Sequence, residues 1–495
     1  MPRIGGRVMP QQGELLLERA ARWIYTALGV LLLPALVGHL CWRGLRQRDY
    51  LRHWPERFSG GPPASARLPQ WLLGDRGSDQ LVLWIHAVSV GETRAAAPLI
   101  NRWLSQSDRH AVLLTHTTPT GRATGADLFA QWIDLAPPRL VQRYLPYDFP
   151  WAGRRFLQWA RPSLGVLMET ELWPNLLAQA RKLSIPMALI NARLSPRSGQ
   201  RLRRFRWLSR PAVAGLVGIA AQTPRDAQGF ESVVLPTLNH QTAGLAPRVQ
   251  VLGNMKFDVD VPDTLKQLGL QWRSLIAGRG ADAAAGPLHL WVAISTRDDE
   301  ESAILSAWSA ARSNSTLTPA DVLLIVPRHP QRFERVAQLI RDHGAVVCSR
   351  SQDWADSDQS ERLDAQSASP REVVYLGDSL GEMFAYLAMA DLVLIGGSIK
   401  PLGGQNPLEA CALGRPVFFG PHMFNFYEIA RELKACGAGT EIASADDWIR
   451  QGLKCLQDQA QMDDRAARAL AFSRTHRGAT ARTEEFLKTI LQTNH

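Results

Sequence analysis

The stretch between residues 391 and 426, DLVLIGGSIKPLGGQNPLEACALGRPVFFGPHMFNF, restricts the fold more than any other part of the chain. Residues 392–395 form a short, wholly apolar run, which is typical of a strand buried on both faces of a parallel sheet. Four glycines follow, and they let the backbone turn sharply and approach a ligand closely: Gly396, Gly397, Gly403 and Gly404. The stretch therefore predicts a parallel sheet with a glycine loop at the end of one strand.

A helix start follows the glycines. Asn406 stands where an N-cap belongs, Pro407 at the first helical position, and Glu409 three residues after the cap. Gly414 ends the predicted helix, and the next strand begins at residue 417. A helix N-terminus behind a glycine loop offers backbone N–H groups to a phosphate. The segment thus predicts a phosphate-binding turn, although such loops also serve as plain tight connections.

Short apolar runs separated by helical segments recur along the 495 residues. This alternation is the pattern of parallel α/β sheets, and the chain is long enough for two such domains. Residues 351–370 are acidic, rich in Ser and Gln and poor in apolar side chains, so they are predicted to be a flexible insertion. The predicted strands are residues 81–85, 111–115, 164–168, 187–190, 291–295, 322–326, 346–348, 373–376 and 392–395.

The two halves of the chain carry opposite charge. Residues 1–260 contain 32 Lys and Arg against 17 Asp and Glu, a formal +15, and the rest has 24 against 29, a formal −5. A basic first half favours an anionic partner: nucleic acid, an acidic membrane surface or a phosphorylated substrate. Five scattered cysteines without a CxxC pair, and histidines without a HExxH arrangement, favour neither a disulfide framework nor a metal site.

Residues 24–42, IYTALGVLLLPALVGHLCW, contain no Asp, Glu, Lys or Arg and are close to the length of one bilayer crossing. Aromatic residues at both ends suit the membrane interface. A signal peptide would have a shorter apolar core and a small-residue cleavage site. We therefore expect a membrane anchor, either a single span or a shallow insertion in one leaflet; the alternative is a buried helix of the globular domain.

Several segments closely resemble the transferases of 3-deoxy-D-manno-octulosonic acid (Kdo), which move this sugar from its CMP ester onto lipid A precursors. They occur in the order that this family shows: HAVSVGE (86–92), METELWPN (168–175), NARLSPRS (191–198), VPRHPQRF (326–333), GDSLGEM (377–383) and the glycine-rich stretch from residue 396. One stretch, STRDDEE (295–301), departs from the family because it lacks the usual glycine. That departure leaves the backbone path there open.

The resemblance implies an α/β fold of the GT-B glycosyltransferase type, with two facing Rossmann-like domains and an N-terminal membrane-anchor helix. Residues 1–60 would be the anchor and its basic flank, residues 61–250 the acceptor-binding domain, and residues 251–495 the CMP-sugar domain. The last helix is a candidate to pack back onto the first domain. The implied location is the cell inner membrane, with a single-pass or monotopic anchor and the catalytic domains on the cytoplasmic side.

In that family the glutamate that matches Glu92 is the proposed catalytic base. The residues alone also fit a carboxylate that complements a helix dipole, and a helix N-terminus is expected to lower its pKa. Of Glu169 and Glu171, one has the alternative of simply orienting an arginine, and the sequence does not choose between them. The acceptor-side candidates are Ser89, Gly91, Glu169, Glu171, Arg193 and Arg197.

On the donor side, Lys256, Arg328 and the helix start at Asn406 are expected to stabilise the phosphate of CMP-Kdo without a divalent metal. Glu409 is either the capping partner of Asn406 or a carboxylate that grips the ribose diol. No cofactor is implied. The donor-binding candidates are Lys256, Ser295, Thr296, Arg328, His329, Gly377, Asp378, Gly381, Gly396, Gly397, Ser398, Gly403, Gly404, Asn406 and Glu409.

Seven arginines between residues 193 and 210 form the densest basic run in the chain. They are either a solvent-exposed helix face or a dock for anionic inner-membrane lipids or substrate phosphates. Nucleic acid is not expected as a partner, because no recognised binding motif accompanies the run.

These motifs predict an inverting, metal-independent transferase that moves Kdo from CMP-Kdo to lipid IVA, with Glu92 as the base. The alternatives are another GT-B nucleotide-sugar enzyme, such as an epimerase, and a membrane-tethered protein that only binds a nucleotide sugar. A pure binding protein needs no carboxylate on the acceptor side, so HAVSVGE favours the enzyme.

Overall fold

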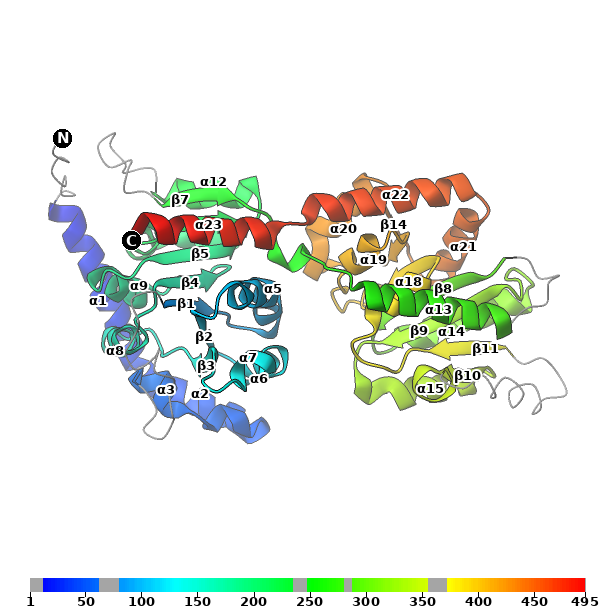
Figure 1. Ribbon diagram of the computed structural model, residues 1–495, viewed down its shortest axis with the longest axis horizontal. Coiled ribbons are helices and arrows are strands. Elements are labelled where there is room, and N and C mark those ends of the chain that lie inside the picture. Colours follow the sequence, from blue (N-terminus) through cyan, green and yellow to red (C-terminus); the bar gives the residue numbers. More distant parts are fainter. Residues whose placement is uncertain (1–11, 62–79, 235–246, 280–286, 355–371, 495) are drawn as a thin grey trace. The chain divides into compact units, whose positions relative to one another are not determined.

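The computed structural model describes residues 12–61, 80–234, 247–279, 287–354 and 372–494, and it shows two compact units (Figure 1). The first unit contains Met1–Asp258 and Gly478–His495, and the second contains Val259–Arg477. The sequence placed the boundary near residue 250, slightly before the observed one. Most of the predicted insertion at residues 351–370 lies outside the described residues.

The first unit is built on seven parallel strands in the order β3-β2-β1-β4-β5-β6-β7. Apolar clusters lie on both faces of this sheet, which explains why its central strands are continuous apolar runs. The strand order reverses between β1 and β4, and ligands bind beyond the carboxyl ends of strands at such a point. The strands are β1 Leu81–His86, β2 His110–His116, β3 Leu140–Tyr144, β4 Leu164–Met168, β5 Met187–Ala192, β6 Gly218–Ala221 and β7 Arg248–Val251.

Helices cover this sheet, and the last one comes from the C-terminus. Helix α23 packs its Phe486 and Leu487 into the core beside α5, and Glu484 of α23 accepts a 2.7 Å hydrogen bond from Arg102 of α5. The C-terminal helix thus belongs to the first unit. The helices are α3 Trp54–Ser59, α5 Val90–Gln106, α6 Pro119–Leu128, α7 Ala130–Ile133, α8 Pro150–Ala160, α9 Pro174–Lys182, α10 Pro196–Arg204, α11 Arg206–Ala214, α12 Pro224–Val234 and α23 Ala479–Asn494.

The second unit repeats the architecture, with seven parallel strands in the order β10-β11-β9-β8-β12-β13-β14. Its order reverses between β8 and β12. The strands are β8 His289–Thr296, β9 Asp321–Pro327, β10 Val346–Ser349, β11 Val373–Leu376, β12 Leu392–Ile395, β13 Val417–Phe419 and β14 Gly439–Glu441. The helices are α13 Asp263–Arg279, α14 Glu300–Ser313, α15 Phe333–Asp342, α16 Arg350–Asp353, α18 Met383–Met389, α19 Leu408–Ala412, α20 Tyr427–Ala435, α21 Ala445–Leu456 and α22 Gln459–His476.

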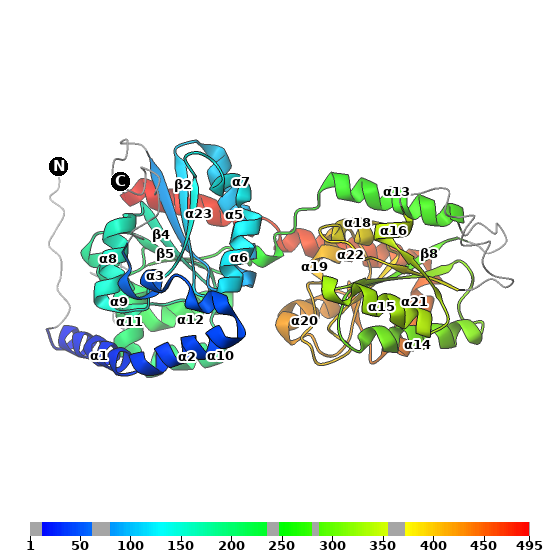
Figure 2. The same ribbon diagram turned by 90° about the horizontal axis from the view of Figure 1, so that it is seen from below.

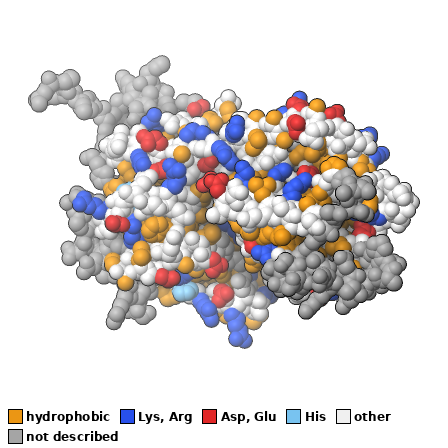
Figure 3. All heavy atoms as spheres, turned by 45° about the vertical axis from the view of Figure 1, so that its right-hand side comes forward, with side chains coloured by type: hydrophobic (Ala, Val, Ile, Leu, Met, Phe, Trp, Pro, Cys, Tyr) orange, Lys and Arg blue, Asp and Glu red, His pale blue; other side chains and the backbone are white. Residues whose placement is uncertain are grey.

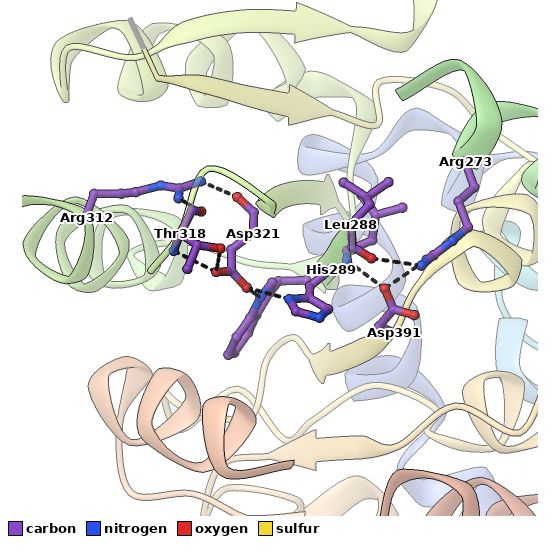
Figure 4. Close-up of polar contacts among 9 residues, drawn as sticks. Arg273, Leu288, His289, Arg312, Thr318, Asp321 and Asp391 are labelled. Carbon is purple, nitrogen blue, oxygen red and sulfur yellow. Dashed lines mark hydrogen bonds and ion pairs between the residues drawn. The ribbon is translucent and has the colours of Figure 1, made fainter. Parts of the chain in front are cut away.

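The amino ends of the central strands in the second unit are joined by polar contacts (Figure 4). Arg273 of α13 forms a 2.8 Å ion pair with Asp391, just before β12. Asp321, at the start of β9, accepts hydrogen bonds from His289 and Trp291 at 3.2 and 3.0 Å. Burial alone would raise the pKa of Asp321, but these bonds and those from Thr318 lower it to about 2. These contacts join the amino ends of the strands, at the sheet edge opposite the carboxyl ends where ligands bind in such folds.

The N-terminal apolar segment is not one straight helix. Helix α1, Gln12–Leu31, and helix α2, Leu33–Arg46, meet at a bend of 49°, and Pro34 at the start of α2 cannot continue the hydrogen bonding of α1. Figure 2 shows both helices along one side of the first unit, and α1 contacts α9 and α11. Among the described residues no single helix is long and apolar enough to span a membrane, while this bent pair passes by length and composition. A straight spanning helix over residues 24–42 is therefore not observed.

Candidate active site

Glu92 lies at the carboxyl end of β1, where the strand order of the first unit reverses. Ser89 caps α5, and its hydroxyl accepts a 3.4 Å hydrogen bond from the Glu92 N–H and donates one of 3.2 Å to the Glu92 carboxylate. The other carboxylate oxygen accepts from the Val88 N–H at 2.8 Å. This is a variant of the capping box, in which the glutamate accepts the N–H of the residue before the N-cap in place of the N-cap N–H. Glu92 therefore does stabilise the start of its helix.

Capping does not explain the burial of this carboxylate. Glu92 is only 8% exposed, and burial raises its pKa to about 7, with the charges of Glu169 and Glu171 adding to the rise. Hydrogen bonds from Val88 and Ser89 act in the opposite direction but are outweighed. The predicted lowering of the Glu92 pKa by the helix N-terminus is thus wrong, because desolvation dominates. A carboxylate with a pKa near neutrality is well matched to general-base work at physiological pH.

Two further carboxylates share this edge of the sheet. Glu169 follows β4 with a φ of +56° and forms an ion pair with Lys256. Glu171 accepts a 3.0 Å hydrogen bond from the Trp173 indole, and burial together with the charge of Glu169 raises its pKa. Glu169 is therefore paired with a lysine rather than an arginine. Lys256, predicted for the donor side, lies in the first unit instead.

Residues at the end of β2 and just after it, which were not predicted from the sequence, stabilise the loop before Glu92 by hydrogen bonds to its backbone carbonyl groups. Thr117 and Thr118 donate to the Val88 carbonyl at 3.3 and 3.1 Å, and His116 lies 3.1 Å from the Ala87 carbonyl oxygen. Burial lowers the pKa of His116 to about 4, so this histidine is neutral and serves as a hydrogen-bonding support. The signal in the sequence was the polar turn HTTPTG directly after the second strand.

The remaining acceptor-side candidates are less tightly connected. Gly91 is exposed, and a Cβ built there would meet nothing closer than the Ser89 hydroxyl at 3.9 Å, so space does not require glycine. Arg193 follows β5 at the same edge of the sheet, and Arg197 lies on α10; both side chains are exposed. They belong to the basic surface of residues 193–210.

In the second unit, backbone N–H groups of the glycine loop after β12 already have a hydrogen-bond acceptor inside the fold. The buried carboxylate of Glu300 accepts from the N–H groups of Gly397, Ile399 and Arg297 at 2.5, 3.0 and 3.1 Å. The Gly397 N–H, which was predicted to face a phosphate, therefore donates to an internal carboxylate instead. Gly396 is required for a different reason, since a Cβ there would lie 2.4 Å from the Ser295 backbone.

Several other donor-side candidates support the loop from inside. Ser398 is fully buried, and its hydroxyl accepts a 2.8 Å hydrogen bond from the Gly420 N–H, which joins β12 to the end of β13. Thr296 donates to Glu301 at 3.0 Å. Gly403 and Gly404 have φ of +96° and +72°, and a Cβ at either would lie 2.2 Å from a neighbouring side chain. These residues fix the shape of the edge.

The helix after the loop is shorter than predicted. Helix α19 contains five residues and begins at Leu408, whose N–H donates to the Asn406 side chain at 3.1 Å. The N-cap is Pro407, one residue later than predicted, so the assignment of Asn406 as the N-cap and of Pro407 as the first helical residue is wrong. So short a helix also has a small dipole to offer a phosphate. Glu409 lies half-buried in its first turn.

The candidates after β11 form a separate group. Gly377 packs against Val326 and Tyr386, and the Asp378 carboxylate accepts a 2.8 Å hydrogen bond from the Ser351 N–H. Gly381 has a φ of +81° in open surroundings. Gly377 and Asp378 therefore stabilise the edge near β11, and only the backbone at Gly381 requires glycine by conformation.

Cations gather at the carboxyl ends of β8 and β9. Burial lowers the pKa of His329, and the nearby charges of Arg328 and Arg297 add to this effect. The Nε of Arg297 is buried and has no hydrogen-bond partner in the described part of the chain. Arg297 was not predicted, although it stands in the stretch STRDDEE that departs from the family. Arg297 and Arg328 therefore offer positive charge to a phosphate at this edge, and His329, whose pKa is lowered, offers a neutral imidazole.

No group of three or more His, Cys, Asp or Glu side chains is placed to hold a metal ion within the described ranges. Whether the reaction needs a divalent metal therefore stays a prediction.

Comparisons with known proteins agree with this arrangement. Residues 52–259 match the family described as 3-Deoxy-D-manno-octulosonic-acid transferase (kdotransferase). A 3-deoxy-D-manno-octulosonic acid transferase of Bordetella pertussis is 39% identical over 474 residues, which cover 94% of this chain and 99% of the relative. One of Haemophilus influenzae is 30% identical over 478 residues, covering 96% and 99%.

Among solved structures, the crystal structure of a glycosyltransferase from Rickettsia africae superposes with a TM-score of 0.50. It is 9% identical, and the match covers 84% of this chain and all of that one, so it speaks for the fold alone. Two parallel sheets of this topology are the GT-B architecture. The chain is an enzyme that belongs to the 3-deoxy-D-manno-octulosonic acid transferase family of glycosyltransferases.

Proposed function

We propose that this protein transfers Kdo from CMP-Kdo to the lipid A precursor lipid IVA, with inversion of configuration, without a metal, and with Glu92 as the general base. The observation that carries the proposal is the buried Glu92 carboxylate at the strand reversal of the first unit, with a pKa of about 7. The names of the B. pertussis and H. influenzae relatives support the sugar that is transferred.

The proposed chemistry is one displacement. Ionised Glu92 accepts the proton of the acceptor hydroxyl while that oxygen forms a bond to the anomeric carbon of Kdo. The bond from this carbon to the phosphate oxygen breaks, and CMP leaves with the electron pair. Arg328 and Arg297 at the edge of β8 and β9 supply positive charge for the leaving phosphate, and the neutral imidazole of His329 is available as a hydrogen-bond donor. A single phosphate carries less charge than a diphosphate, so side-chain cations suffice in this proposal.

Purified full-length protein, CMP-Kdo and lipid IVA provide the direct test. We expect mass spectrometry to find lipid IVA heavier by one or more Kdo units, and the variant Glu92→Gln to form this product at least about 100-fold more slowly. Binding of CMP-Kdo without any product on lipid IVA would contradict the proposed transferase reaction and favour a binding protein.

We also propose a monotopic attachment to the cytoplasmic face of the inner membrane. The inner side of α1 is bound to the first unit, because buried Thr26 hydrogen-bonds with Asn175 of α9. The outer side exposes large apolar residues, including Trp23 at 72% and Leu31 at 74%. Figure 3 shows hydrophobic side chains scattered among charged ones on the face of the molecule that it draws, and such scattered exposure is not evidence of membrane binding. The exposed apolar residues of α1 are instead concentrated on one helix. A helix of this kind inserts into one leaflet.

A further inference from the structure

A pocket of about 120 Å³ lies in the first unit. Its lining residues come from α1, α9 and α11, and Figure 2 shows where these helices lie. One wall is the apolar side of α11, and the other two walls are basic. The charged residues that line it are Arg19 and Arg22 of α1, Arg181 and Lys182 of α9, and a single acid, Glu18. Four positive charges against one negative charge are thus brought together by helices that are far apart in the sequence.

The fold compensates this charge only in part. Burial lowers the pKa of Arg22, and the positive charges of Arg181 and Arg19 lower it further, while the carboxylates of Glu18 and Asp148 act in the opposite direction with a smaller effect. The nearby carboxylate of Asp148 is already engaged, because it accepts the N–H groups of Asn175 and Leu176 at 3.1 and 2.8 Å. In the part of the chain that the structure describes, no ion pair or side-chain hydrogen bond involves the four cations of the pocket. Arg19, Arg181 and Lys182 are exposed, so solvent screens part of their mutual repulsion, and a bound anion would relieve the rest.

The size of the pocket suits a small anion. One ordered water needs roughly 10–15 Å³ of such volume, so the pocket holds several water-sized groups, enough for a phosphate with some of its hydration. Guanidinium groups bind phosphate oxygens in bidentate geometry, and two of the four cations face the pocket from each of two helices.

We propose that this pocket binds the phosphate group of an anionic membrane lipid. A lipid is favoured over a soluble anion because the pocket adjoins the exposed apolar side of α1: Trp23 lies one turn after Arg19 and is 72% exposed, and Leu16 is 63% exposed. Lipid acyl chains would cover these side chains while the phosphate enters the pocket. The proposal rests on the monotopic attachment described above and assigns it a specific lipid group.

Vesicle binding separates a phosphate site from general attraction to negative membranes. The full chain is added to phosphatidylcholine vesicles that contain either phosphatidic acid or a phosphate-free anionic lipid, adjusted to equal surface potential. The pocket variant is Arg22→Gln with Arg181→Gln, and the matched control is Arg43→Gln with Arg46→Gln on α2, which removes the same charge outside the pocket. Thermal unfolding verifies that each variant is folded, and Lys182→Gln replaces the double variant if that one is not.

We expect wild type to prefer phosphatidic acid by about tenfold, since one charge-assisted hydrogen bond accounts for such a factor. The pocket variant should lose this preference, and the control should keep it while binding both vesicles more weakly. Equal binding of both vesicles by wild type, or an unchanged preference in the pocket variant, overturns the site but leaves the attachment intact. Stabilisation of wild type by inorganic phosphate through the same arginines, without any lipid preference, overturns the lipid assignment. Binding to neither vesicle overturns the attachment as well.

Discussion

Replacing Glu92 with Gln removes the proton-accepting group and keeps the shape of the capping box. A glutamine oxygen still accepts the Val88 N–H, which Glu92 now accepts at 2.8 Å, so the start of α5 is preserved. The loss of a positioned base slows the proton transfer by about 10²–10⁴-fold, equivalent to about 3–5 kcal/mol in the activation free energy. Binding of CMP-Kdo should stay close to normal, because the second unit supplies the donor candidates.

The same substitution should change stability in a direction that a surface cap would not. The pKa of Glu92 is raised to about 7 in the folded chain, so the stability that Glu92 contributes is full below about pH 4.5 and is lost as pH rises through 7. Its ionisation in the folded state costs on the order of 3 kcal/mol at alkaline pH. Glu92→Gln should therefore melt higher than wild type at pH 8 and lose much of this pH dependence.

A second capping box gives a matched control. In α21, Ser444 is the N-cap, and the Asp447 carboxylate accepts the Ala443 N–H at 2.9 Å, so the local geometry repeats that of Ser89 and Glu92. A hydrogen bond from Arg450 and that from Ala443 lower the pKa of Asp447. Asp447→Asn should lower stability by about 0.5–2 kcal/mol and leave turnover unchanged.

Single-turnover rates and melting temperatures, both measured from pH 5 to 9, distinguish these outcomes. The wild-type rate should rise with pH through about 7 as Glu92 ionises, and the variant should lack this step. A folded Glu92→Gln enzyme with the wild-type rate would refute the assignment of the base. A variant that melts lower at pH 8 would refute the burial argument.

Four further predictions use other parts of the structure. Glu300→Ala leaves the Gly397 N–H and its neighbours without their acceptor, so unfolding should require at least about 2 kcal/mol less and the KM for CMP-Kdo should rise; a normal KM in a folded variant would contradict the role of the loop. Asp321 has its pKa lowered to about 2, so its contribution to stability is present above about pH 4 and is lost as pH falls towards 2; acid titration of Asp321→Asn should lack this step. Activity should persist in excess EDTA, and loss of turnover that Mg²⁺ restores would contradict a metal-independent reaction. Trp23→Glu combined with Leu28→Glu should release the protein from vesicles without lowering its melting temperature, because both side chains are exposed; retention after this change would contradict insertion by α1.

The sequence predicted most of the sheet strands because buried parallel strands are continuous apolar runs. All ten predicted runs, including the one that begins at residue 417, are strands, and the bounds of β4 and β12 match those predicted. The missed strands lack that signal. β3, LVQRY, lies at a sheet edge and carries polar side chains, and β6, GIAA, consists mostly of small residues that do not mark a strand. A strand at a sheet edge, or one made of small side chains, lacks the continuous run of large apolar residues from which a buried strand is predicted.

The candidate site was less predictable, because its chemistry depends on burial. The sequence placed Glu92 at a helix start, where the structure also has it, yet the sequence cannot supply the desolvation that raises the pKa of Glu92. Lys256 was assigned to the wrong unit because the chain passes between units only after Asp258. The ion pair of Lys256 with Glu169 joins residues far apart in sequence, and no local spacing encodes it.

The stretch STRDDEE contributes both a buried carboxylate and an arginine to the ligand-binding edge proposed for the second unit. The buried Glu300 carboxylate accepts hydrogen bonds from the backbone N–H groups of the glycine loop. These donors stabilise its negative charge inside the fold, which weakens its repulsion of a phosphate outside. Arg297 in the same stretch keeps a buried Nε without a partner among the described residues, close enough to His329 to lower its pKa. The glycine loop is thus braced by a carboxylate, and the arginine side chains beside it are left to meet a phosphate. Specificity for the donor phosphate should therefore depend on Arg297 and Arg328 rather than on the loop amides.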